Sequence, residues 1–123
     1  MATVTAKINL TSNNLTSDSL NLTVTDTLTV TGKITQKTVV TSTTATKFLE
    51  ADDYTDAYVF LYNKSSTAAE IIDIRSGATS AEDFMSLGAG EFAFFQWAAD
   101  EDLNYDADSG TPVLEVMVFQ AAA

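Results

Sequence analysis

The sequence predicts an all-β protein: an extended N-terminal β arm followed by a small antiparallel β-sandwich of the jelly-roll kind. Three observations predict this fold. Apolar and polar residues alternate from Leu20 to Ile34, short apolar segments are separated by turn residues, and the segment Glu91–Trp97 is apolar on both of its faces. Strict alternation is typical of half-buried strands, and a strand that is apolar on both faces lies between two layers.

A change in composition near residue 48 divides the chain into two parts. All twelve aromatic residues lie at Phe48 or later. Residues 1–49 carry four Lys and two Asp, a net charge of +2, whereas residues 50–123 carry fifteen acids and two bases, a net charge of −13. We therefore predict a Thr-rich β arm over residues 1–47, which serves oligomerisation or attachment, and a compact sandwich domain over residues 48–123.

The arm has one apolar stripe. Every odd position from Ser19 to Thr35 is Ser, Asn, Lys or Thr, so the other face is polar. The apolar residues of the stripe occupy even positions: Leu20, Leu22, Val24, Leu28, Val30 and Ile34. Two strands with such a stripe are marginal alone in water. We expect the stripe to pack on the C-terminal domain, on arms of sister subunits or on a partner protein; an ordinary edge hairpin of the same domain is the alternative.

The second part is expected to contain short strands joined by turns. Asn63–Thr67 and Gly88–Gly90 have the composition of turns, and Ser80–Met85 has the pattern of one capped helical turn. The segment Ala98–Gly110 is expected to be an acidic loop. The predicted strands are Ala57–Tyr62, Ala69–Arg75, Phe84–Leu87, Glu91–Trp97 and Pro112–Phe119.

Composition excludes several classes of chemistry. The chain of 123 residues has no Cys and no His, so it has no disulfide, thiolate metal site or imidazole base. A net charge of −11 argues against binding nucleic acid or an anionic membrane. No apolar run is long enough to span a bilayer, and residues 1–5 do not resemble a signal peptide. We expect a soluble protein made in the cytoplasm, with no cofactor and no enzymatic activity.

The acidic segment Asp100–Asp108 places oxygen ligands at every second residue, as calcium loops do. Counted from Asp100, the EF-hand template fails at its Gly and at its final Glu, where the chain has Tyr105 and Thr111. A solvated acidic loop is the favoured interpretation, and a calcium site is the alternative.

Four carboxylates, at Glu50, Asp52, Asp53 and Asp56, suggest the acid pair of a glycoside hydrolase. That reaction needs two carboxyl groups that face each other across a cleft, and these four crowd one connection between strands. A solvated turn is the favoured interpretation.

Aromatic side chains at Phe92, Phe94, Phe95 and Trp97 are expected to serve the core, because they belong to the half of the chain that holds all the aromatic residues. Trp97 is the expected exception, since it precedes a loop and its indole N–H needs a partner.

Two stretches resemble phage structural proteins. The arm Asn21–Gly32 is similar to the Thr/Val/Leu repeats of phage tail-fibre shafts and virion arms. The stretch Leu87–Trp97, with Ser109–Glu115, resembles small β-sandwich proteins of phage structural modules, several of which decorate capsids as trimers.

The resemblance implies a capsid decoration (cement) protein that binds the major capsid protein on the outer surface of a virion as a homotrimer, with no catalytic residues, cofactor or metal. A tail-fibre or appendage component with a receptor-binding head is the first alternative. A carbohydrate-binding module that exposes Trp97 and the acidic loop is the second. The interface candidates are Leu20, Leu22, Val24, Leu28, Val30, Ile34 and Trp97.

Overall fold

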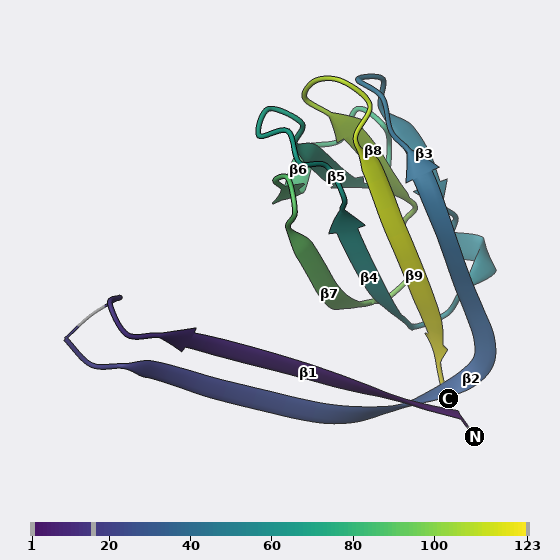
Figure 1. Cartoon of the computed structure of the whole chain (residues 1–123). Helices are drawn as coiled ribbons and strands as arrows, with labels where there is room; N and C mark the ends of the chain where they lie inside the picture. Colours follow the sequence, from purple (N-terminus) through teal and green to yellow (C-terminus); the bar gives the residue numbers. More distant parts are fainter. Residues whose placement is uncertain (1, 16, 123) are drawn as a thin grey trace.

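The computed structural model describes residues 2–15 and 17–122, and these residues form two antiparallel sheets packed face to face (Figure 1). The strand order is β1-β2-β9-β4-β7 in the five-stranded sheet and β3-β8-β5-β6 in the four-stranded sheet. The prediction of an all-β fold, with an extended arm before a small antiparallel sandwich, is confirmed. The strands are β1 (Ala2–Ser12), β2 (Leu20–Val40), β3 (Thr46–Leu49), β4 (Ala57–Asn63), β5 (Ile72–Ser76), β6 (Asp83–Leu87), β7 (Phe92–Trp97), β8 (Leu103–Ala107) and β9 (Val113–Ala121), with one 3₁₀ turn, η1 (Ala51–Asp53).

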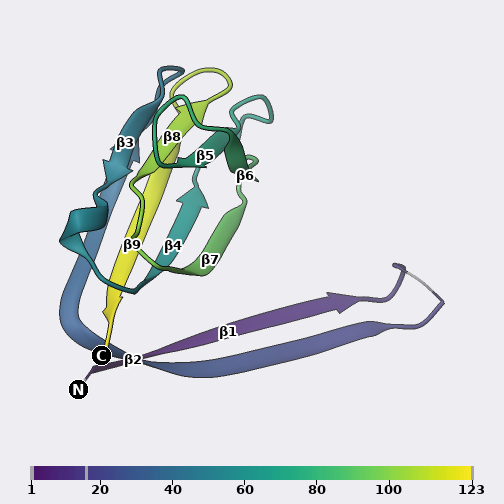
Figure 2. The same cartoon turned by 180° about the vertical axis from the view of Figure 1, so that it is seen from behind.

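The long strand β2 belongs to both the arm and the sandwich. Its first half pairs with β1 along eleven residues, and its second half pairs with β9 from Ile34 to Val40. The pairing register shifts between Val30 and Ile34, where the strand bends sharply (Figure 1). Residues 2–15 and 17–30, called the arm hairpin below, therefore leave the sandwich at this bend and project beyond β7 (Figure 2).

The sandwich interior is built from the alternate, inward-facing residues of its strands. In β4 and β9 every second residue is buried, as the two-residue period of a strand requires. The second sheet closes this core with aliphatic side chains from β5 and β8. The largest fully buried aliphatic residues of the sandwich are Val59, Leu61, Ile72, Ile74, Leu103, Leu114, Val116 and Val118.

The expected acidic loop Ala98–Gly110 is wrong, because it contains strand β8. Leu103, Tyr105 and Ala107 are buried in the core, and the polar residues between them alternate with these three. Asp106 within β8, and the acidic residues on either side of the strand, concealed a strand whose inner face is apolar.

Two further boundaries differ from expectation. Ser80–Met85 forms no helical turn: the N–H of Ala81 donates to the carbonyl of Ala78 in a tight turn, and β6 follows. Strand β5 begins at Ile72 rather than at Ala69, because the N–H of Glu70 donates to the carbonyl of Thr67 and closes a turn there. In both places local turn bonding replaces the regular pattern.

Lysines near the bend tie the second half of β2 to the connection between β3 and β4. The ammonium of Lys33 donates to the carbonyl of Asp53 and lies 4.4 Å from the ring centroid of Tyr54, and Lys37 donates to the carbonyl of Phe48. These contacts and the β2–β9 pairing join residues 33–40 to the sandwich. The predicted division of the chain into an arm over residues 1–47 and a sandwich domain over residues 48–123 stays a prediction, because it concerns whether the two parts fold independently.

Candidate interaction face

The apolar side of the arm hairpin continues the outer side of the five-stranded sheet. Val30 of β2 pairs with Ala121 of β9, and Ile34 pairs with Phe119, so the pairing register shifts by two residues at the bend. Because side chains alternate between faces with a period of two, this shift keeps the even-numbered residues of β2 on the same face before and after the bend. This shared surface, called the concave face below, is lined by apolar residues of the arm hairpin and by outward-facing residues of β4, β7 and β9. The bend turns the arm part toward the sheet part (Figure 1).

On the arm side, opposite residues of β1 and β2 pair their side chains on the concave face: Val4 with Leu28, Ile8 with Val24, and Leu10 with Leu22. Burial falls along the hairpin away from the bend. Leu28 is 8% exposed, whereas Leu22 and Leu10 are 46% and 50% exposed. The part of the hairpin beyond the bend thus carries large apolar side chains that the rest of the described chain does not cover.

On the sheet side, an aromatic group crosses β4 and β7. Tyr58 stacks on Phe94 with ring centroids 6.4 Å apart, and Phe60 lies 6.2 Å from Phe92 and 6.5 Å from Tyr62. These rings occupy the face of the sheet that points away from β3, β5, β6 and β8. Phe92 is 61% exposed, which contradicts the expectation that it serves the core.

Two hollows separate the arm hairpin from these rings. One has a volume of about 250 Å³ and lies between Ile8 and Val24 on the arm and Tyr58 and Phe94 on the sheet. The other has a volume of about 320 Å³ and lies between β1 and Phe60, Phe92, Met117 and Phe119. The arm hairpin thus extends over the aromatic group without filling the space above it.

The predicted stripe divides into covered and uncovered parts. Leu28 and Val30 are buried at the bend, where they anchor the hairpin to its own chain. Ile34, at 54% exposed, lies on the outer face of the second half of β2. The candidates that stay exposed on the hairpin are Leu20, Leu22 and Val24.

Trp97 is not at an exposed position, contrary to the expectation for it. The residue is 7% exposed, belongs to the core, packs 5.8 Å from the ring of Tyr54, and donates its indole N–H to the carbonyl of Glu101 at 3.2 Å. Its position opposite Ala57 places it on the inner face of β7. The carbohydrate-binding alternative, which placed Trp97 at an exposed site, is contradicted at that residue.

Several acidic residues of the predicted calcium segment are engaged by the protein itself. Arg75 donates to Asp106 and to Asp83, both at 2.6 Å, and Asp102 accepts the N–H of Ala51 at 2.7 Å. Asn104 is buried and donates to the carbonyl of Gly77. Within the described ranges no group of three or more acidic side chains is arranged to hold a metal ion.

One carboxylate on the outer face of the four-stranded sheet has a perturbed titration. Burial disfavours the charged form of Asp73 and, with a hydrogen bond shared with Asp108, raises its pKa to about 6. The hydroxyl of Ser86 donates to Asp73 at 2.9 Å and opposes this shift. Asp73 lies on β5 and Asp108 directly follows β8.

Of the four carboxylates between β3 and β4, Glu50 and Asp53 line one open hollow of about 270 Å³ together with Lys37 and Lys47. Glu50 pairs with Lys47 at 2.6 Å, and Asp52 and Asp53 lie exposed on η1.

Over residues 2–15 and 17–122 there is no helix with the length and hydrophobicity of a transmembrane span.

No protein-family model, curated protein or solved structure matches this chain. The concave face therefore stands as the candidate site on its geometry alone. The sequence stripe indicated its arm side, whereas its aromatic side was assigned to the core. The only signal for that side was the apolar character of both faces of β7, which predicts a second layer on each face.

Proposed function

We propose that this protein is a structural attachment protein and, in the form that its sequence favours, a capsid decoration protein that binds the outer surface of a viral shell as a homotrimer. The observation that carries the proposal is the uncovered apolar side of the arm hairpin. Ile8, Leu10, Leu22 and Val24 are each at least 43% exposed on one face of a projecting two-stranded ribbon.

A ribbon of this kind needs a partner surface. An isolated two-stranded hairpin is marginally stable, and exposed apolar patches of this sort mark protein–protein contacts. Fully burying an exposed Leu, Ile or Val side chain contributes about 1.5–3 kcal/mol. Because these four side chains are about half exposed, covering each one contributes about half of that. A shell protein repeated over many sites is the partner that the sequence resemblance favours.

The charge distribution supports an outward-facing sandwich. The arm hairpin carries Lys7, Asp18 and Asp26, a net charge of −1, which leaves −10 for the rest of the chain. Strongly acidic domains repel one another and stay soluble when they crowd a surface. The hairpin, with its low charge, is then the part that contacts the partner.

The test measures copy number on particles. An antibody raised against the purified protein detects it in virus particles from cells that carry its gene. A stained gel of the purified particles then gives the number of copies of the protein per particle, and cryo-microscopy locates these copies. Hundreds of copies on the shell support decoration. A handful at a tail identifies an appendage component, and particles that lack the protein contradict both viral roles.

The matched variants are Leu22→Asp, on the apolar side of the hairpin, and Thr27→Asp, on its polar side. Both add one negative charge to an exposed residue of β2. Only Leu22→Asp is expected to abolish binding of purified protein to particles stripped of it. Equal binding by the two variants would remove the hairpin from the contact.

A further inference from the structure

The two sheets differ in how their edge strands are protected. Natural sheets prevent pairing with other chains by short edge strands, charges and bulges. In the four-stranded sheet, β3 has four residues, includes Lys47, and shifts register against β8 between Lys47 and Leu49. β6 begins at Asp83, which pairs with Arg75 at 2.6 Å, and the β5–β6 register shifts at Arg75. Both edges of this sheet are blocked.

The edges of the five-stranded sheet have neither charge clusters nor bulges. β7 contains no charged residue and no Pro, and it pairs with β4 along all six residues without a register shift. β1 pairs with β2 along eleven residues without a shift, and Lys7 is its only charged residue. Neither strand has a further partner among the described residues.

The backbone groups on the free edge of β7 are identified by the pairing. The N–H of Asn63 donates to the carbonyl of Glu91 at 3.0 Å. Hydrogen-bonded pairs alternate along an antiparallel ladder, so the backbone N–H and C=O groups of Ala93 and Phe95 point toward β4. The backbone N–H and C=O groups of Phe92, Phe94 and Gln96 point away from β4. Those three residues offer an open row of donors and acceptors.

We propose that the free edge of β7 is a docking site for strand β1 of a second copy of this chain, which pairs with it by strand addition. The inference rests on the proposed function and deepens it, since it names the contact that joins copies. Strand addition gives affinity through main-chain hydrogen bonds and specificity through alternate side chains.

Charge and side-chain pattern favour β1 as the occupant. A second acidic sandwich is repelled by the first, whereas β1 carries one Lys and no acid. Glu91, an exposed acid, directly precedes β7, so a strand that carries a lysine is favoured at this edge over one that carries acids. The alternate apolar residues of β1 extend the side on which Phe92 and Phe94 lie.

The two edges are different surfaces, so the contact is head to tail. Such contacts close into rings when the rotation permits and otherwise form open filaments. A closed ring of three copies agrees with the homotrimer of the proposed function, and it leaves Leu10, Leu20 and Leu22 at the far end of each hairpin available to a larger partner.

The first test uses variants of the full-length protein in sedimentation velocity, without particles. Gln96→Pro removes one outward N–H without breaking a bond to β4, and Gln96→Ala keeps that N–H. We expect wild type and Gln96→Ala to form the same oligomer and Gln96→Pro to weaken association at least tenfold. A monomeric wild type at about 100 μM, or unchanged association of Gln96→Pro, would overturn the proposal.

A second pair of variants covers the case in which Gln96→Pro misfolds. Phe92→Lys and Phe84→Lys each replace an exposed Phe by a charge, at 61% and 53% exposure, on edge strands of opposite sheets. Only Phe92→Lys is expected to dissociate the oligomer, with the circular dichroism of both variants unchanged. Equal effects, or none, would contradict a site at β7.

The occupant is identified by competition. A synthetic peptide of residues 1–13 in excess is expected to dissociate the oligomer, and a scrambled peptide is not. Dissociation by Gln96→Pro without competition by the peptide would assign the edge to a segment other than β1. Intact self-association together with failure to bind particles would contradict the proposed function alone.

Discussion

The arm hairpin and the sandwich use the same alternation of apolar and polar residues with opposite results. In β9 the alternate side chains of Leu114, Val116 and Val118 are fully buried between sheets. In the first half of β2 the alternate side chains of Leu22 and Val24 are 46% and 54% exposed. The difference lies in what covers the strand, because a two-residue period predicts a face and leaves its partner undefined.

The largest effect is expected in the sandwich core. Leu61→Ala removes a fully buried side chain and is expected to lower the free energy of unfolding by about 2–5 kcal/mol, because the cavity adds to the lost transfer energy. Urea denaturation of the variant and wild type measures this. A loss below about 1 kcal/mol would show that the two sheets pack less closely at this position.

A slightly smaller loss is expected at the buried amide of Asn63. Its Nδ2 donates to the carbonyls of Glu70 and Leu87 at 2.9 and 3.0 Å, and its Oδ1 accepts the N–H of Ser65. Asn63→Ala leaves these groups unpaired and should cost about 2–3 kcal/mol. Thermal unfolding checks this, with exposed Lys64→Ala as the neighbouring control; an equal melting temperature for both variants would contradict it.

A substitution in the arm hairpin, by contrast, should change the free energy of unfolding very little. Leu22→Asp is expected to change the free energy of unfolding of the dissociated protein by no more than about 0.5 kcal/mol, because the side chain is exposed there. Denaturant unfolding at low protein concentration measures this stability. A destabilisation as large as that of Leu61→Ala would show that the hairpin packs on its own sandwich.

A further expected effect on stability depends on pH. The pKa of Asp73 is raised to about 6 from an ordinary value of 3.8, so the folded state binds a proton more tightly than the unfolded state. Its contribution to stability is present below about pH 4 and is lost as the pH rises through 6.

Asp73→Asn is therefore expected to stabilise the protein at pH 7 by about 1 kcal/mol at most, after allowance for solvent screening, and to lose this advantage at pH 4. Thermal unfolding at the two pH values measures it. The same gain at both would show that Asp73 does not titrate in this range.

The aromatic residues show where prediction from sequence succeeded and failed. The alternation in Glu91–Trp97 correctly placed Phe92 and Phe94 on one face and Phe95 and Trp97 on the other. It did not reveal which face points inward, because both are apolar. Trp97 proved to be a core residue and Phe92 an exposed one. Strand β8 was missed for a related reason, since Asp106 within it and the acidic residues that flank it resemble a solvated loop.

The structure also alters how the charge difference between the two parts of the chain is interpreted. Residues 1–49 carry a net charge of +2, yet Lys33, Lys37 and Lys47 lie in the sandwich strands rather than in the arm hairpin. The projecting hairpin itself is nearly neutral. Composition measured along the chain cannot separate the two halves of a strand that bends from one layer into another.

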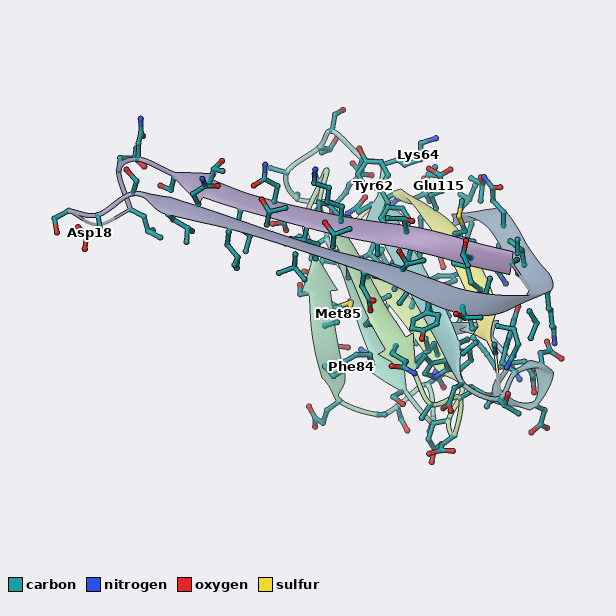
Figure 3. All side chains as sticks on the ribbon, turned by 90° about the horizontal axis from the view of Figure 1, so that it is seen from below. Asp18, Tyr62, Lys64, Phe84, Met85 and Glu115 are labelled. Carbon is teal, nitrogen blue, oxygen red and sulfur yellow. The ribbon has the colours of Figure 1, made fainter. Side chains whose placement is uncertain are left out.

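The sequence by itself determined the all-β class, the alternating faces of the arm and the absence of Cys and His chemistry, because these follow from residue types and a two-residue period. Only the tertiary structure decided the strand order, the inward face of β7, and the bend that turns the arm hairpin toward the aromatic group. Those features depend on contacts between residues far apart in the chain. Figure 3 shows Asp18 at the far end of the hairpin, and Tyr62 of β4 and Lys64, just after that strand, close to Glu115 of β9.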